Sequence, residues 1–331
     1  MFKIIKAIAF ASTLALTMGG AGGGAGLASA DEITLSGANC FPLGSPVGVP
    51  FENVVAEINK RGKGILQIDL KGGAPAIGDP FTIVQKMTRS VYDIAGCPGA
   101  FFGNVFPEAP VLDYTQHPYH VLRKNGAMDL LTEMMVKKNI QFIGRYHDFG
   151  PFHLWLNEKI DKPDLTGLHL RVSPVYTPFF KAMGATVQVS NISQVYTYME
   201  NNTVKGYGWP ALGWVPSWVE VTKYRVEPGF YSAPLFVLMN SKKWNSLTDE
   251  QRNVVTSVVA EFEARTEPDS DELLAALKKQ KDWMSSKGLD AITFTGADAE
   301  KWLKTASDAG WAQVFKRTPE HAEELRKLLS K

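Results

Sequence analysis

An arginine at the end of a short alternating run is the strongest chemical signal in this sequence. In Leu165–Val172 (LTGLHLRV), apolar and polar residues alternate up to Arg171. A pleated strand would place the apolar side chains on one face and Arg171 on the other. Pro174 cannot extend a strand, so Arg171 should lie near the carboxyl end, where open α/β sheets bind ligands. A guanidinium there can pair with a carboxylate, although a surface arginine on an edge strand is the alternative.

The elements around this strand follow a layout that occurs twice. Hydrophobic periodicity predicts, in each copy, a strand, a helix, a strand, a helix and a strand. They span 33–37, 51–58, 66–70, 79–87 and 91–95 in the first copy, and 168–172, 174–183, 186–189, 193–201 and 207–209 in the second. Right-handed crossovers would place the first and third strands of the first copy side by side. The sequence therefore predicts two similar α/β halves with a ligand cleft between their strand ends.

The C-terminal third is predicted to be helical. A capping box at Thr248–Gln251 precedes an apolar stripe at 254–262, and further helices are expected at 271–287 and 297–315. Their charged outer faces carry no functional signal.

Residues 1–30 have the pattern of a secretory signal peptide. Lys3 and Lys6 precede an apolar run at 7–18, and small residues end in Ala28–Ala30. Cleavage there would reduce the 35 basic residues to 33, against 34 acidic ones, so nothing favours binding to nucleic acid. No cysteine begins the mature chain, where a lipid anchor would need one. We expect an exported protein that is not lipid-anchored.

Cys40 and Cys97 are the only cysteines. They follow strands that should be neighbours, so in an oxidising compartment they could form a disulfide. Two buried free thiols are the alternative.

No catalytic constellation stands out. The chain has no G-x-S-x-G elbow, no phosphate loop and no H-E-x-x-H motif. The glycines at 20–26 lie in the predicted signal peptide, and Pro118 between His117 and His120 argues against helical presentation of a metal-ligand pair. We therefore predict no catalytic residue, no cofactor and no metal.

Several segments together resemble the substrate-binding proteins of TRAP transporters (tripartite ATP-independent periplasmic transporters) of the C4-dicarboxylate-binding DctP type. They are DLTGLHLRV at 164–172, FKAMGA at 180–185, SQVY at 193–196, NTVKG at 202–206 with Trp209-Pro210, and LTDEQR at 247–252. The resemblance implies a two-domain periplasmic-binding-protein clamshell. Each domain would be a mixed sheet flanked by helices, with a long C-terminal helix crossing the domains.

The resemblance also implies domain boundaries and partners. Domain I would comprise 31–148 and about 237–276, and domain II 149–236 and about 277–331. The protein would be a periplasmic monomer that passes an organic acid to the small and large TRAP membrane subunits. The arginine matching Arg171 pairs with the substrate carboxylate in that family.

Two departures from the family shape the expected ligand. Many relatives have a second arginine about twenty residues before the first, where this chain has Pro151–Trp155, so His153 could be a weak substitute. Relatives commonly have an asparagine where this chain has Trp209. Besides Arg171 as the clamp, the predicted ligand-binding residues are Trp209, Phe101, His153, Asn191, Phe41 and Trp214.

One strong cation among aromatic side chains favours a monocarboxylate with an aromatic or apolar body. The alternative ligand is a C4-dicarboxylate, keto acid or sugar acid. A secreted α/β enzyme is the remaining alternative.

Overall fold

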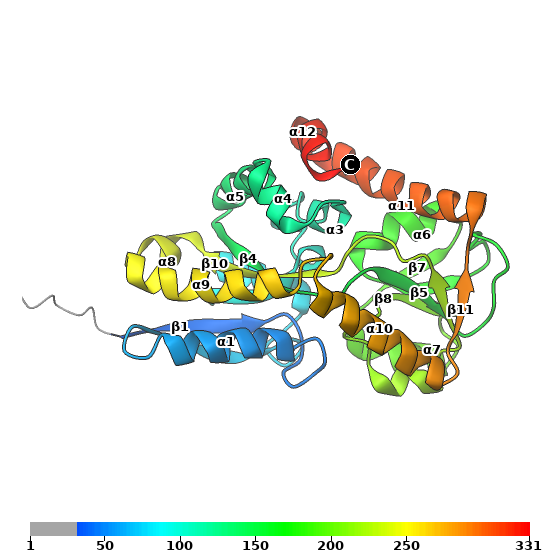
Figure 1. The fold of residues 1–331 in the computed structure, drawn as a ribbon, viewed down its shortest axis with the longest axis horizontal. Helices are drawn as coiled ribbons and strands as arrows, with labels where there is room; N and C mark the ends of the chain where they lie inside the picture. The colour runs from blue at the N-terminus through cyan, green and yellow to red at the C-terminus, as the bar shows by residue number, and fades with distance from the viewer. Residues whose placement is uncertain (1–31) are drawn as a thin grey trace, which may run out of the picture. The chain divides into compact units, whose positions relative to one another are not determined.

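The structure, a computed structural model, describes residues 32–331 (Figure 1). The predicted signal peptide lies outside these residues. Within them, no helix combines the length and the apolar character needed to cross a membrane.

The first sheet has five strands in the order β2-β1-β3-β10-β4. β1 lies parallel to β2 and β3, while β10 runs antiparallel to β3 and β4. The strands are β1 (Ile33–Asn39), β2 (Leu66–Gly73), β3 (Ile94–Pro98), β4 (Ile140–Asp148) and β10 (Pro234–Asn240). The first and third strands are neighbours, as predicted.

The second sheet has six strands in the order β11-β9-β5-β8-β6-β7. They are β5 (Phe152–Leu156), β6 (His169–Val172), β7 (Thr186–Val189), β8 (Gly206–Pro210), β9 (Tyr224–Glu227) and β11 (Asp290–Thr293). β6 lies parallel to both β7 and β8. The order β7-β6-β8 matches β2-β1-β3, so the predicted repeated layout is confirmed.

Three connections join the sheets. The chain passes from β4 to β5 through residues 149–151, returns from β9 to β10 through 228–233, and passes again from β10 to β11 through 241–289. The first two lie side by side, with hydrogen bonds from Phe149 N to Ala233 O and from Phe152 N, at the start of β5, to Phe230 O. The boundary predicted between 236 and 237 falls inside β10, all of which belongs to the first sheet. The domain boundaries otherwise stay a prediction.

Helices flank both sheets. The α-helices are α1 (Val49–Arg61), α2 (Ile83–Thr88), α3 (Val111–Tyr114), α4 (Tyr119–Lys124), α5 (Ala127–Val136), α6 (Thr177–Ala182), α7 (Val195–Glu200), α8 (Ser241–Asn245), α9 (Asp249–Arg265), α10 (Asp271–Ser286), α11 (Gly296–Arg317) and α12 (Pro319–Leu329). Short 3₁₀ turns are η1 (Pro80–Thr82), η2 (Gly99–Phe101), η3 (Pro174–Tyr176), η4 (Ile192–Gln194) and η5 (Pro216–Glu220). This mixed α/β architecture is the predicted fold class.

Sequence patterns account for the longest helices. α1 buries Phe51, Val54, Val55 and Ile58, the predicted apolar face. The capping box that begins α9 is present, with Thr248 Oγ1 accepting from Gln251 N at 3.2 Å and Gln251 Oε1 accepting from Thr248 N at 3.0 Å. α9 packs against β4 of the first sheet.

The long helix α11 contacts elements that accompany both sheets. It packs along α6 and also against α3, as Figure 1 shows in orange. A Cβ at Gly310 would lie 2.9 Å from Tyr231 Oη and 3.0 Å from the Tyr114 ring, so only glycine allows this close approach. The predicted long C-terminal helix is therefore confirmed.

Candidate functional site

Arg171 lies in an inner strand and not at a sheet edge. β6 is hydrogen-bonded to β7 on one side and β8 on the other, and Leu170 and Val172 are fully buried. Ser173 ends the strand and Pro174 begins η3. The strand thus delivers Arg171 to the carboxyl end of the sheet, the side where α/β folds bind ligands.

The guanidinium of Arg171 is buried among neutral groups. Arg171 is 2% exposed. Its Nε donates to Ser190 Oγ at 3.3 Å, its Nη1 to Tyr176 Oη at 3.5 Å, and its Nη2 to the carbonyl oxygen of Ser190. Cζ lies 5.6 Å from the centre of the Trp209 ring. Burial lowers the pKa of Arg171, yet an arginine stays protonated in proteins.

Arg171 is exceptional among the buried arginines. Of residues 32–331, Arg145, Arg171 and Arg225 are buried. Arg145 pairs with Asp148 at 3.2 Å and with Glu267 at 3.3 Å, and Arg225 pairs with Glu227 at 2.9 Å. None of the ion pairs within the described residues includes Arg171. A buried charge without a counter-charge costs several kcal/mol, so this site is electrostatically incomplete without an anion.

Three predicted aromatic residues surround one small cavity, which we call the inner cavity. Phe41, Phe101 and Trp209 line it together with Ser173 and Phe152. The rings of Phe41 and Phe101 are 5.3 Å apart, and Trp209 Nε1 donates to Gly213 O at 3.1 Å.

The inner cavity is too small for an organic acid. It measures about 30 Å³, whereas small-molecule sites usually measure about 300 Å³ or more. An organic acid could therefore reach this place only if the aromatic side chains, or the two sheets, move apart.

Asn191 lies next to these residues. It lines a second, smaller cavity together with Phe41 and Phe101. Its Oδ1 accepts hydrogen bonds from Ser193 N at 3.1 Å and from Ser193 Oγ at 2.5 Å, so it caps the turn that leads into α7. Asn191 follows Ser190, the partner of Arg171, and remains a candidate contact.

His153 faces a different environment from the one we expected. Its Nδ1 lies 3.0 Å from Val226 O and 3.5 Å from Glu227 Oε2, and its ring is fully buried. The sequence could not reveal this, because Glu227 belongs to β9, which pairs with β5 only in the fold. We leave His153 out of the proposed site.

Trp214 is also remote from the inner cavity. Its ring packs 5.2 Å from Trp155, 5.7 Å from Trp218 and 6.2 Å from Trp283, measured between ring centres. It is 3% exposed and belongs to the core. We leave Trp214 out of the proposed site as well.

His153 should instead contribute to the fall of the unfolding free energy at acidic pH. Burial lowers its pKa to about 4 and outweighs the opposing effects of Glu227 and the Val226 carbonyl. The unfolded value is about 6.5, so the stabilisation is complete above that pH and is lost as the pH falls toward 4, by about 3 kcal/mol. Urea unfolding of His153→Phe should show a flatter decline of the unfolding free energy between pH 6.5 and 4. An unchanged slope would contradict this role.

Two direct partners of Arg171 were not predicted from the sequence. Ser190 follows the end of β7, so the strand-end criterion that selected Arg171 also applies to it. Tyr176 lies in η3 and reaches back across the sheet, where its hydroxyl donates to Gly208 O at 2.6 Å. No sequence pattern indicated that contact.

Comparisons with known proteins identify the family and the fold. Residues 38–318 match the sequence model of DctP, described as bacterial extracellular solute-binding protein, family 7. The solute-binding protein RD1_1052 of Roseobacter denitrificans is 26% identical over 184 residues, which cover 54% of this chain and 53% of that protein. The chain spans 53% of the length of this relative and 64% of the length of another curated relative, from Haemophilus influenzae.

Two solved structures share the fold. A TRAP periplasmic solute-binding protein from Desulfovibrio salexigens, with bound orotic acid, has a TM-score of 0.75 at 18% identity, covering 89% of this chain and 97% of that one. DctP7 of Bordetella pertussis, a solute receptor that binds pyroglutamic acid, has a TM-score of 0.78 at 15% identity, covering 90% and 99%. The resemblance to TRAP substrate-binding proteins is thereby confirmed, and this chain belongs to the bacterial extracellular solute-binding proteins of family 7.

Proposed function

We propose that this protein is the periplasmic receptor of a TRAP transporter for a monocarboxylate with an aromatic or apolar body. Arg171 binds the carboxylate, and Trp209, Phe101 and Phe41 contact the body of the ligand, with Asn191 close by. The protein would be exported through a signal peptide and would deliver its ligand to the small and large membrane subunits.

The observation that carries this proposal is the incomplete charge balance at Arg171. A ligand carboxylate would supply the counter-charge and accept the charge-assisted hydrogen bonds that the neutral partners of Arg171 cannot provide. The other two buried arginines already pair with carboxylates of the protein. One available buried cation favours one carboxylate on the ligand, and the aromatic walls favour an apolar body.

The compared structures support a carboxylate ligand but leave its class open. Orotic acid and pyroglutamic acid each carry one carboxyl group on a ring. The solute-binding protein RD1_1052 of Roseobacter denitrificans is solved with bound L-galactonate and a TRAP solute-binding protein of Haemophilus influenzae with bound L-gulonate, so a sugar acid, keto acid or C4-dicarboxylate is the alternative ligand. In that case the further polar groups of the ligand would have to bind backbone groups and Asn191.

A thermal-shift panel would test the proposal. We expect phenylacetate or benzoate to raise the melting temperature of the mature protein more than succinate, malate, galactonate or the polar ring acids orotate and pyroglutamate. A ligand at 100 times its Kd stabilises the folded state by about 2.7 kcal/mol. Calorimetry of the hits should give one site per chain, and NMR should show no product. Stabilisation by dicarboxylates or sugar acids alone would overturn the proposed ligand class, and turnover would overturn the receptor function.

A further inference from the structure

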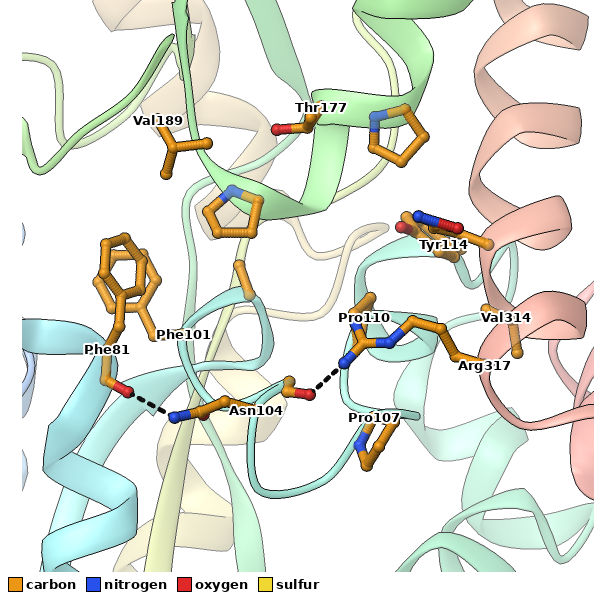
Figure 2. A pocket seen from close by; sticks show the side chains of 15 residues that line it. Phe81, Phe101, Asn104, Pro107, Pro110, Tyr114, Thr177, Val189, Val314 and Arg317 are labelled. Atoms are coloured by element: carbon orange, nitrogen blue, oxygen red, sulfur yellow. Dashed lines mark hydrogen bonds between the residues drawn. The ribbon is translucent and has the colours of Figure 1, made fainter. Parts of the chain in front are cut away.

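A third cavity, much larger than the other two, lies beside the inner cavity, and we call it the outer groove. It measures about 390 Å³ and is drawn in Figure 2. Figure 2 shows Phe81 and Phe101 on one side, Tyr114 and Arg317 of α11 on the opposite side, and Thr177 and Val189 above them. Segments that accompany both sheets therefore contribute to it.

The lining of the outer groove is mainly apolar. Four prolines and three aromatic residues line it, and no carboxylate does. The one charged lining residue, Arg317, donates from Nη2 to the carbonyl oxygen of Gly103, as the dashed line in Figure 2 shows. Val189 is 48% exposed although it is apolar. Such a surface suits an uncharged apolar group.

The outer groove adjoins the inner cavity through shared residues, and Arg171, which lines neither space, contacts the Trp209 ring that lines the inner cavity. Ala100 and Phe101 line both the outer groove and the inner cavity. Pro174 and Val189 line the groove, and their chain neighbours are Ser173, which lines the inner cavity, and Ser190, which bonds to Arg171. The Phe101 ring, held edge-on against Phe81 with ring centres 4.9 Å apart, is thus a wall common to both spaces.

The volumes decide where the body of a ligand can go. The inner cavity has room for about one or two water molecules, whereas the outer groove falls within the range of small-molecule sites. A ligand anchored at Arg171 can therefore extend its apolar part past Phe101 into the groove. A compact acid would leave the groove unfilled.

We propose that the outer groove is a subsite for the distal apolar part of an elongated monocarboxylate whose carboxylate pairs with Arg171. This inference rests on the proposed function and narrows it. The preferred ligand is an acid that carries its ring several bonds from the carboxylate. Phe101 packs against the chain between the two ends.

Calorimetry of the full mature chain with two probes tests this subsite. In phenylacetate one methylene separates the ring from the carboxylate, and in 4-phenylbutyrate three do. We expect 4-phenylbutyrate to bind about tenfold more tightly, because two further methylenes and the ring are buried in the groove. Val189→Trp fills the groove and should weaken 4-phenylbutyrate about tenfold while changing phenylacetate less than threefold. Val91→Trp, the same substitution at an exposed valine that does not line the groove, should change neither.

The outcomes distinguish failure of the subsite from failure of the proposed ligand class. Equal affinity of the two acids, or equal weakening of both by Val189→Trp, overturns the subsite and leaves a receptor for compact monocarboxylates. Binding of neither acid overturns both the subsite and the proposed ligand class. Unchanged 4-phenylbutyrate binding in Val189→Trp also overturns the subsite, provided that circular dichroism shows the variant to be folded.

Discussion

Replacing Arg171 with methionine should abolish ligand binding and at the same time stabilise the unliganded protein. Arg171 is buried, and the three atoms that accept its hydrogen bonds, two on Ser190 and one on Tyr176, belong to neutral groups. Methionine has a similar length and carries no charge, so it removes the desolvation cost of the guanidinium. Replacing a whole buried ion pair by apolar residues of similar volume can stabilise a protein by about 1 to 4 kcal/mol, and Arg171→Met removes a buried charge that has no counter-charge in the protein to lose. Binding of a carboxylate should weaken by about 100-fold or more, because a desolvated charge pair is lost.

Arg225→Met is the matched control. Arg225 is also a buried arginine, but its Nε donates to Glu227 at 2.9 Å. Removing it leaves Lys281, 2.9 Å away, as the remaining cationic partner of Glu227, so the unfolding free energy should fall while ligand affinity is retained. We therefore expect the two substitutions to change the unfolding free energy in opposite directions, measured by urea unfolding. Only Arg171→Met should weaken ligand binding, measured by calorimetry on dialysed protein.

The proposal fails if Arg171→Met binds the same acids within a few-fold of the parent. Loss of stability together with loss of binding would mean that Arg171 holds the fold through Ser190 and Tyr176. In that case the argument that the site requires an exogenous anion would be wrong.

The correct sequence predictions are those that depend on short stretches of chain. The β6 strand and the position of Arg171 follow from alternation and one proline. The buried face of α1 and the capping box of α9 depend on residues within one or two helical turns. The neighbouring placement of Cys40 and Cys97 followed from the handedness of crossovers, which holds across α/β folds.

The site residues that we revised depend on contacts between distant segments. His153 contacts Val226 and Glu227, and Trp214 contacts Trp283 of α10, so neither environment can be read from the neighbouring sequence. Between β3 and β4 the chain forms α3, α4 and α5, which are short helices interrupted by prolines and glycines. Their periodicity is too brief to predict them. The helix α12 was missed although Thr318-Pro319 is a recognisable start signal.

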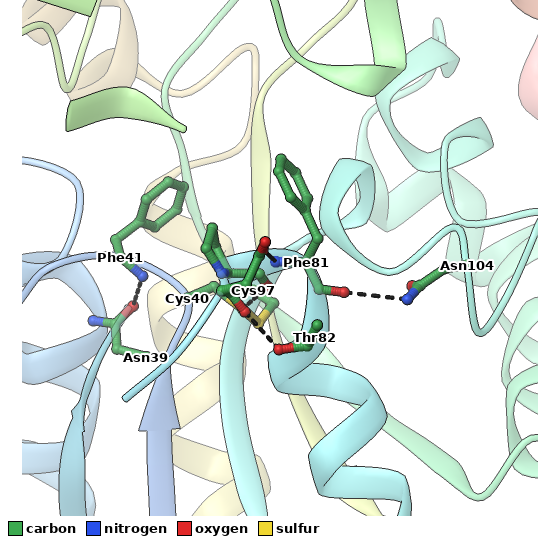
Figure 3. The surroundings of a disulfide bond; sticks show 9 residues. Asn39, Cys40, Phe41, Phe81, Thr82, Cys97 and Asn104 are labelled. Atoms are coloured by element: carbon green, nitrogen blue, oxygen red, sulfur yellow. Dashed lines mark hydrogen bonds between the residues drawn. A yellow bond between two sulfur atoms is a disulfide. The ribbon is translucent and has the colours of Figure 1, made fainter. Parts of the chain in front are cut away.

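Reducing or removing the disulfide should have the second large effect. In the structure Cys40 and Cys97 form a disulfide, and their Cα atoms are 5.1 Å apart (Figure 3). The two cysteines are 57 residues apart in the sequence. Closing a loop of that length lowers the entropy of the unfolded chain and so raises its free energy by about 4 kcal/mol. The double variant Cys40→Ala/Cys97→Ala should lose about that much unfolding free energy in urea.

The same disulfide lies next to Phe41 and close to Phe101, two of the aromatic residues that line the inner cavity. Phe41 directly follows Cys40, and its backbone N–H donates to Asn39 Oδ1 at 3.0 Å (Figure 3). Cys97 lies in β3, four residues before Phe101, and the Phe101 ring contacts the Phe41 ring. The double variant should therefore bind ligand more weakly as well as unfold more easily, because Phe41 and Phe101 lose the link between their strands. Parent protein that shows two free thiols when denatured without reductant would contradict both expectations. If the variant were destabilised but bound ligand with normal affinity, the disulfide would contribute to stability only. Asn39 and the packing around η2 would then hold Phe41 and Phe101 in place.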